Sequence, residues 1–178
     1  MAQTGWWIST WNADDQVLEP SVKVLLAMGR RDGMCGEFAG YGQPPSLPEA
    51  QAVTLQGRRP DPSALTYLLE GPRRVTFSFE VNKERALQPA RLRIHLSDQD
   101  SATEPVLQVV LNGQNFERLL PRGLGLQKKH PYEMAFPLTA MFDLPAGSLQ
   151  AGENIMEISM ANASWVTLDA LDLLSHAL

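Results

Sequence analysis

The residues best suited to bind a ligand lie in one basic segment of an otherwise acidic chain. Between Glu117 and Glu133 the sequence holds Arg118, Arg122, Lys128, Lys129 and His130. Because clustered cations attract carboxylates, this segment predicts a binding site for a carboxylated ligand. Tyr132 belongs to the same segment, and the amides of nearby Asn112 and Asn115 can hydrogen-bond to hydroxyl groups. The alternative interpretation is a solvated loop.

Acidic side chains form groups that could supply the oxygen ligands preferred by calcium. The groups are Asp32 with Glu37, Asp98 with Asp100 and Glu104, and Asp169 with Asp172. The second group lacks the glycine and the length of a calcium-binding loop. Solvated carboxylates in turns are the alternative interpretation for each group.

Nucleophilic and zinc-dependent catalysis are not indicated. The three histidines, His95, His130 and His176, are scattered along the chain, and no G-x-S-x-G motif is present. Cys35 lies near Asp32 and Glu37, and this acidic setting disfavours a reactive thiolate. A small lyase remains as an alternative hypothesis, because His130 and Tyr132 adjoin cations that could neutralise a uronate carboxylate.

Aromatic residues offer a further kind of binding site, since sugars stack their apolar faces on aromatic rings. Tyr41, in the glycine-flanked stretch FAGYGQPP, is predicted to serve this purpose. Trp6, Trp7 and Trp11 crowd the start of the chain. They are predicted either to close the end of the core or to form an interface.

Short runs of alternating apolar and polar residues must position these side chains. Apolar residues at every second position predict a half-buried strand over 74–81. The same alternation predicts a strand over 90–96, with His95 on its polar face. Further strands are predicted over 22–27, 65–69, 106–111, 155–160 and 165–174, of which 106–111 is expected to be covered on both faces.

Turn residues separate these strands, and helix signals are few. Asn112-Gly113 predicts a tight turn, and a single helical turn is predicted at 46–49. Many short strands with frequent turns favour an all-β fold, an antiparallel β-sandwich.

Length and composition limit the classes of protein that fit this chain. The 178 residues are predicted to form a single β-sandwich domain over 1–178, with 1–20 as an extension or first strand. The net charge of −5 argues against a nucleic-acid-binding protein. No apolar run is long enough for a membrane span, and no signal peptide is visible. One cysteine excludes a disulfide framework.

Three stretches together resemble a known family. They are GRRDGMCGEFAG at 29–40, ARLRIHLSDQ through VLQVVLNGQ at 90–114, and FDLPAGSLQAGENIMEISM with SWVTLDALDLL at 142–174. The set resembles the galactose-binding-like β-sandwich, a jelly roll. More narrowly, it resembles the carbohydrate-binding third domain of rhamnogalacturonan lyases (polysaccharide lyase family 4). The residue types in the stretch 142–174 fit this resemblance. Leu149 is expected to enter the core and Gly152 to reverse the chain. Asn154 is expected to hydrogen-bond the backbone of its own turn, and Ile155 to begin a strand.

The resemblance implies a non-catalytic carbohydrate-binding module on the same polypeptide as a catalytic domain. The implied partner is a polysaccharide or oligosaccharide, and the implied location is extracellular or periplasmic, as part of a secreted enzyme. It also implies a structural calcium ion with Asp169 among its ligands, to which Asp32 and Glu37 are added as candidates. An alternative hypothesis is a structural domain that packs on a catalytic domain without touching sugar. The predicted ligand-binding residues are Tyr41, Asn112, Asn115, Arg118, Arg122, Lys128, Lys129, His130 and Tyr132.

Overall fold

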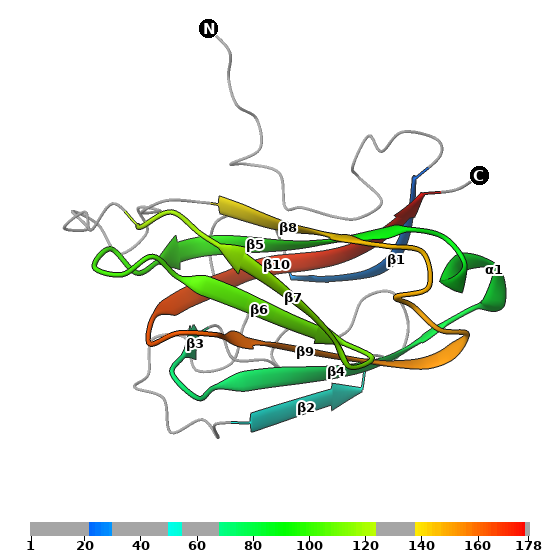
Figure 1. The fold of residues 1–178 in the computed structure, drawn as a ribbon, viewed down its shortest axis with the longest axis horizontal. Helices are drawn as coiled ribbons and strands as arrows, with labels where there is room; N and C mark the ends of the chain where they lie inside the picture. The colour runs from blue at the N-terminus through cyan, green and yellow to red at the C-terminus, as the bar shows by residue number, and fades with distance from the viewer. Residues whose placement is uncertain (1–21, 30–49, 55–67, 124–137, 177–178) are drawn as a thin grey trace, which may run out of the picture.

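The strands of this chain form two sheets that pack face to face, as Figure 1 shows. The computed structural model describes residues 22–29, 50–54, 68–123 and 138–176, and the statements below concern these ranges. This arrangement of strands confirms the predicted β-sandwich.

The first sheet has the strand order β1-β10-β5-β8, with β3 pairing beside the start of β10. All of its pairings are antiparallel. Its strands are β1 (Val22–Gly29), β3 (Leu68–Glu70), β5 (Ala90–Gln99), β8 (Leu138–Leu144) and β10 (Trp165–His176).

The second sheet has the strand order β2-β4-β9-β6-β7. Its strands are β2 (Ala50–Thr54), β4 (Arg74–Val81), β6 (Val106–Leu111), β7 (Gln114–Leu119) and β9 (Gly152–Met160). β2 runs parallel to β4, which departs from the predicted antiparallel pairing, while the other pairs are antiparallel.

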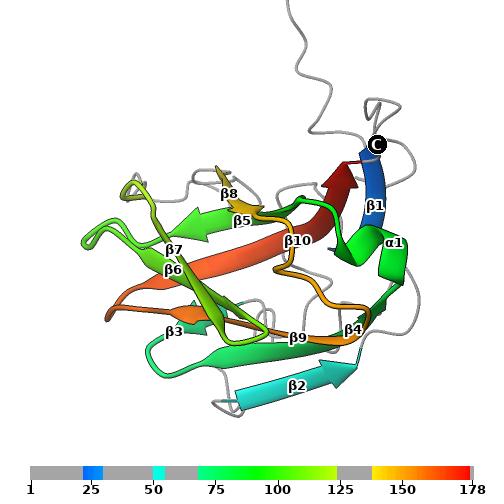
Figure 2. The same ribbon diagram turned by 45° about the vertical axis from the view of Figure 1, so that its right-hand side comes forward.

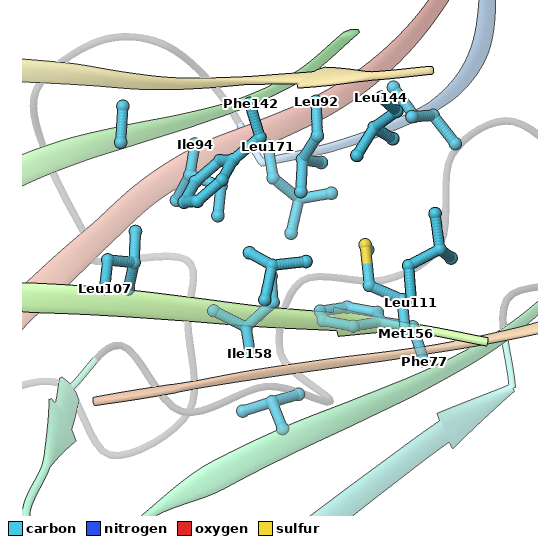
Figure 3. Close-up of a cluster of buried hydrophobic side chains, with 14 of the residues drawn as sticks. Phe77, Leu92, Ile94, Leu107, Leu111, Phe142, Leu144, Met156, Ile158 and Leu171 are labelled. Atoms are coloured by element: carbon cyan, nitrogen blue, oxygen red, sulfur yellow. The ribbon is translucent and has the colours of Figure 1, made fainter. Parts of the chain in front are cut away.

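The core lies between the two sheets and is built by the alternation seen in the sequence (Figure 3). In β4, β6, β8 and β9 every second side chain is buried, as expected where one face of a sheet packs on another. The second sheet contributes Phe77, Leu107, Leu111, Met156 and Ile158, and the first contributes Leu92, Ile94, Phe142, Leu144 and Leu171.

The turns follow the chemistry of their residues. Asn112 and Gly113 have positive φ angles of 50° and 81°, as a two-residue hairpin loop between β6 and β7 requires. The predicted corner after β8 is also confirmed. Leu149 is buried, Gly152 has a φ of 90°, and the Asn154 amide bonds the backbone of residues 150 and 152.

Several details of the strand prediction were wrong. β9 begins at Gly152 rather than at Ile155. In β6 only alternate residues are fully buried, so this strand is not covered on both faces. Between β4 and β5 the chain forms an unpredicted helix, α1 (Lys83–Ala86), where it crosses from the second sheet to the first (Figure 2). The side chain of Asn82 caps this helix by accepting a hydrogen bond from the Arg85 amide at 3.0 Å.

Candidate functional site

The described structure contains four of the nine predicted ligand-binding residues. Asn112, Asn115, Arg118 and Arg122 lie along β7 and at its two ends. Tyr41, Lys128, Lys129, His130 and Tyr132 lie outside the described residues, as do Asp32, Glu37 and the predicted helical turn at 46–49.

Asn112 uses its side chain to join the β6–β7 turn to its neighbours. Its Nδ2 donates to the Ser148 carbonyl oxygen at 2.9 Å and to Asn154 Oδ1 at 2.8 Å. Its Oδ1 accepts from the Ile155 amide at 3.0 Å. Both amide hydrogens are therefore spent within the protein, so the structure gives Asn112 a structural role. Its predicted bond to a sugar hydroxyl stays a prediction.

Asn115 belongs to a row of polar side chains that crosses three neighbouring strands. Asn115 Nδ2 and Gln108 Nε2 both donate to Glu117 Oε1, at 3.1 and 3.3 Å. Ser159 Oγ in turn donates to Gln108 Oε1 at 3.3 Å. We call these four residues the polar ladder. The backbone register creates it, because Gln108 pairs with both Ser159 of β9 and Glu117 of β7.

The polar ladder lies on the outer face of the second sheet. In β9 the buried residues Asn154, Met156, Ile158 and Met160 alternate with others that are exposed or half-buried, and the same alternation holds in β4 and β6. We call the surface formed by the outward residues of β4, β9, β6 and β7 the open face. Val110 and the 52% exposed Ile155 add apolar area to it.

Arg118 and Arg122 do not join the polar ladder. Arg118 is exposed on β7, opposite Leu107, and so has the opposite orientation to Glu117. Arg122 follows the strand and contributes a positive charge near Asp100. The structure therefore separates these two arginines from the amides that were predicted to bind the same ligand.

Asp100 organises the loop after β5, and a calcium site at Asp98, Asp100 and Glu104 stays a prediction. Its carboxylate accepts hydrogen bonds from the Ala102 amide at 2.8 Å and from Ser164 Oγ at 3.0 Å. Burial by itself raises the pKa of Asp100. The hydrogen bonds and the charge of Arg122 lower the pKa by a larger amount, so it lies below its ordinary value. Gly123 packs directly on the Gln99 carbonyl oxygen, leaving no room for a Cβ atom.

A second polar cluster lies within the first sheet. His95 lies on the polar face of its strand, as predicted, yet it is only 2% exposed. Its Nε2 lies 3.0 Å from Asp172 Oδ2, and its Nδ1 lies 2.8 Å from Thr139 Oγ1. Arg93 Nε donates to the other oxygen of Asp172 at 2.7 Å. Because a carboxylate only accepts, the contact with Asp172 places a hydrogen on Nε2 of His95.

This buried cluster contains the residue types of a catalytic triad, but its setting is that of a structural network. Asp172 is fully buried and its two oxygens are committed to Arg93 and His95. Charged groups that are buried in this way require such pairing to offset their loss of hydration. The network ties β5 to β10 and β8 through side chains.

Asp169, the calcium ligand implied by the family resemblance, is 2% exposed and lies at a bulge of β10 where the register with β5 shifts. Within the described ranges, no group of three or more acidic, histidine or cysteine side chains converges as a metal site would require. A calcium site at Asp169 therefore stays a prediction.

The signal for the polar ladder was present in the sequence. Once the tight turn is placed at Asn112-Gly113, counting outward along the two strands pairs Gln108 with Glu117. Ser159 could not be found in this way, because the pairing of β9 with β6 joins segments that are far apart in the chain.

Comparison with known proteins adds similarity in fold alone. No protein-family model and no curated protein matches this chain. Among solved structures, a family 35 carbohydrate-binding module from Cellvibrio japonicus Abf62 aligns with a TM-score of 0.42 at 18% identity, over 62% of this chain and 72% of that one. A family 35 carbohydrate-binding module from an environmental isolate gives a TM-score of 0.42 at 14% identity, over 64% and 74%.

A larger protein is similar over more of this chain. The family GH115 4-O-methyl-α-glucuronidase BtGH115A, described as specific for decorated arabinogalactans, aligns with a TM-score of 0.45 at 12% identity. The alignment covers 96% of this chain and 18% of that one. With each of these TM-scores below 0.5, the alignments assign neither a family nor a ligand. The class that the described strands define is an all-β sandwich of two sheets.

In the described part of the chain, no helix is both long and apolar enough to cross a membrane.

Proposed function

We propose that this chain is a non-catalytic carbohydrate-binding module. The observation that carries the proposal is the open face, where a hydrogen-bonded row of amide, carboxylate and hydroxyl groups lies exposed or half-buried on a five-stranded sheet. Sugars offer hydroxyl groups that both donate and accept hydrogen bonds, and these side chains can exchange bonds with them.

The polar ladder is held in place before any ligand arrives. Glu117 accepts two amide hydrogen bonds, and Gln108 is linked to side chains on both neighbouring strands. A binding group that is already fixed loses little conformational entropy when a ligand binds. Val110 and Ile155 lie on the same face, where their side chains can contact the apolar C–H surfaces of a sugar ring.

We further propose that the module is an ancillary domain of a polysaccharide-degrading enzyme that acts outside the cytoplasm. The support for this step is the resemblance of residues 29–40, 90–114 and 142–174 to the third domain of rhamnogalacturonan lyases. The same resemblance supports a structural calcium ion near Asp169.

Affinity gel electrophoresis and calorimetry against pectin, rhamnogalacturonan, xylan and β-glucan test the proposed function. We expect at least one of these glycans to bind with a Kd below the millimolar range. A Gln108→Ala, Asn115→Ala double variant should weaken binding about tenfold, because each lost hydrogen bond contributes about 0.5–1.5 kcal/mol.

The matched control is Lys83→Ala, an exposed position on α1 outside the open face, which should leave the affinity unchanged. If none of the glycans binds at millimolar sugar, the chain is not a carbohydrate-binding module of this kind. If a glycan binds and the double variant binds it equally well, the open face is not the site.

A further inference from the structure

The open face carries an excess of negative charge. The outward positions of β4, β9, β6 and β7 include four acidic residues and one basic residue, Glu80, Glu117, Glu153, Glu157 and Arg74. Arg74 pairs with one of them, at 3.6 Å between its Nε and Glu157 Oε2. The remaining carboxylates leave the face negative, although the sequence alone indicated a basic binding segment.

The hydrogen bonds of the open face favour ligands that donate. Ser78 Oγ donates to Glu153 Oε1 at 2.7 Å, and Ser159 Oγ donates to Gln108, so the hydrogens of these two hydroxyls are used inside the face. Each ladder amide uses one of its two hydrogens on Glu117 Oε1, and the second carboxylate oxygen accepts no hydrogen bond from a described residue. Apart from Arg74 and Thr76 on β4, acceptors are therefore in excess over free donors on this face. A hydroxyl or ammonium group can donate to them, whereas a carboxylate cannot.

We propose that the open face binds glycans without anionic groups and discriminates against polyuronates. This inference rests on the proposed function and specifies its ligand class. A uronate carboxylate near the polar ladder would meet like charge from Glu117 and find only the second hydrogens of the two ladder amides as donors there. Sugars with free hydroxyl groups fit the excess of acceptors, and an amino sugar would also gain from the negative charge.

The sharpest test compares glycans that share one backbone and differ only in charge. β-Glucan and galactan would be measured by calorimetry before and after oxidation of their C6 hydroxymethyl groups to carboxylates, with polygalacturonate alongside. At low salt we expect oxidation to weaken binding about tenfold, with the difference shrinking at 0.5 M NaCl because salt screens exposed charges.

A charge-removing variant separates electrostatics from other effects of oxidation. Glu157→Gln keeps the shape of the side chain and frees the charge of Arg74, so it should roughly halve the ratio of neutral-glycan affinity to oxidised-glycan affinity. Glu84→Gln, an exposed position on α1 outside the open face, should leave this ratio unchanged.

The possible outcomes distinguish this inference from the proposed function. If an oxidised glycan or polygalacturonate binds as tightly as the neutral form, the inference is overturned while the proposed function stands. If no glycan binds in either form, the proposed function itself fails. The inference is also overturned if the oxidised form binds more weakly but the difference responds neither to salt nor to Glu157→Gln, since charge would then not be the cause.

Discussion

Two arginines of β5 pair with carboxylates of neighbouring strands, and they show that burial, rather than distance, determines how much an ion pair contributes to stability. Arg91 Nε lies 2.6 Å from Asp143 Oδ1, and Arg93 Nε lies 2.7 Å from Asp172 Oδ1. The Asp143 side chain is 78% exposed, whereas that of Asp172 is fully buried. Exposed pairs are screened by water, but breaking a buried pair leaves a charge without compensation.

We therefore predict very different effects from the same substitution at these two positions. Asp172→Asn should lower the free energy of unfolding by about 3 kcal/mol, because Arg93 and His95 would both lose their contact with a buried carboxylate. Asp143→Asn should lower the free energy of unfolding by less than about 1 kcal/mol. Urea denaturation of both variants measures the difference, and equal effects would show that the Asp172 network does not stabilise the fold.

The buried network also shows what alternation can and cannot predict. The pattern over 90–96 correctly separates core residues such as Leu92 and Ile94 from Arg93 and His95. It cannot reveal that the outward residue His95 is also buried, because periodicity identifies the two faces of a strand and not what covers them. The His95–Asp172 contact joins residues 77 positions apart, so no local pattern indicates it.

At the scale of elements, the hairpin of β6 and β7 holds three of the four residues of the polar ladder and depends on its turn. Asn112 has a φ of 50°, which costs a residue with a Cβ about 1 kcal/mol unless its side chain compensates. Here the amide compensates through bonds to Ser148, Asn154 and Ile155.

Two substitutions at Asn112 separate the backbone contribution from the hydrogen bonds. Asn112→Gly keeps the positive φ and loses the amide, so it should destabilise the protein by about 1–3 kcal/mol. Asn112→Ala loses both and should be about 1 kcal/mol less stable than the glycine variant. Thermal denaturation of the three proteins gives these differences, and an alanine variant as stable as the glycine variant would contradict the proposed strain.

The elements themselves follow closely from the sequence where they are long and alternate. The predicted bounds 74–81 and 106–111 coincide with β4 and β6. The four-residue α1 was missed because so short a segment has no helical period to detect. The parallel pairing of β2 with β4 was missed because the register between distant strands depends on the whole sheet.

At the scale of the molecule, the two sheets differ on their outer faces. The outward residues of the second sheet are exposed or half-buried, whereas the outward residues His95, Ser97 and Asp172 of the first are buried polar groups. A ligand can therefore reach the second sheet directly, while the polar groups of the first contribute to stability. The charge of the open face follows from strand pairing, which collects carboxylates from β4, β9 and β7.

The predicted calcium ion would act on the stability of the whole fold, because Asp169 lies in β10, the strand that pairs with β1, β3 and β5. An ion that binds only the folded state at a hundred times its Kd stabilises that state by about 2.7 kcal/mol. For a protein of this size, this stabilisation corresponds to a rise in Tm of about 5–10 °C.

Scanning calorimetry with calcium and with EDTA should show this rise in the wild type, and Asp169→Asn should abolish it. Asp143→Asn, which removes an exposed carboxylate, should retain the rise. A wild-type Tm that is the same with calcium and with EDTA would exclude the ion, and a full rise in Asp169→Asn would place it elsewhere.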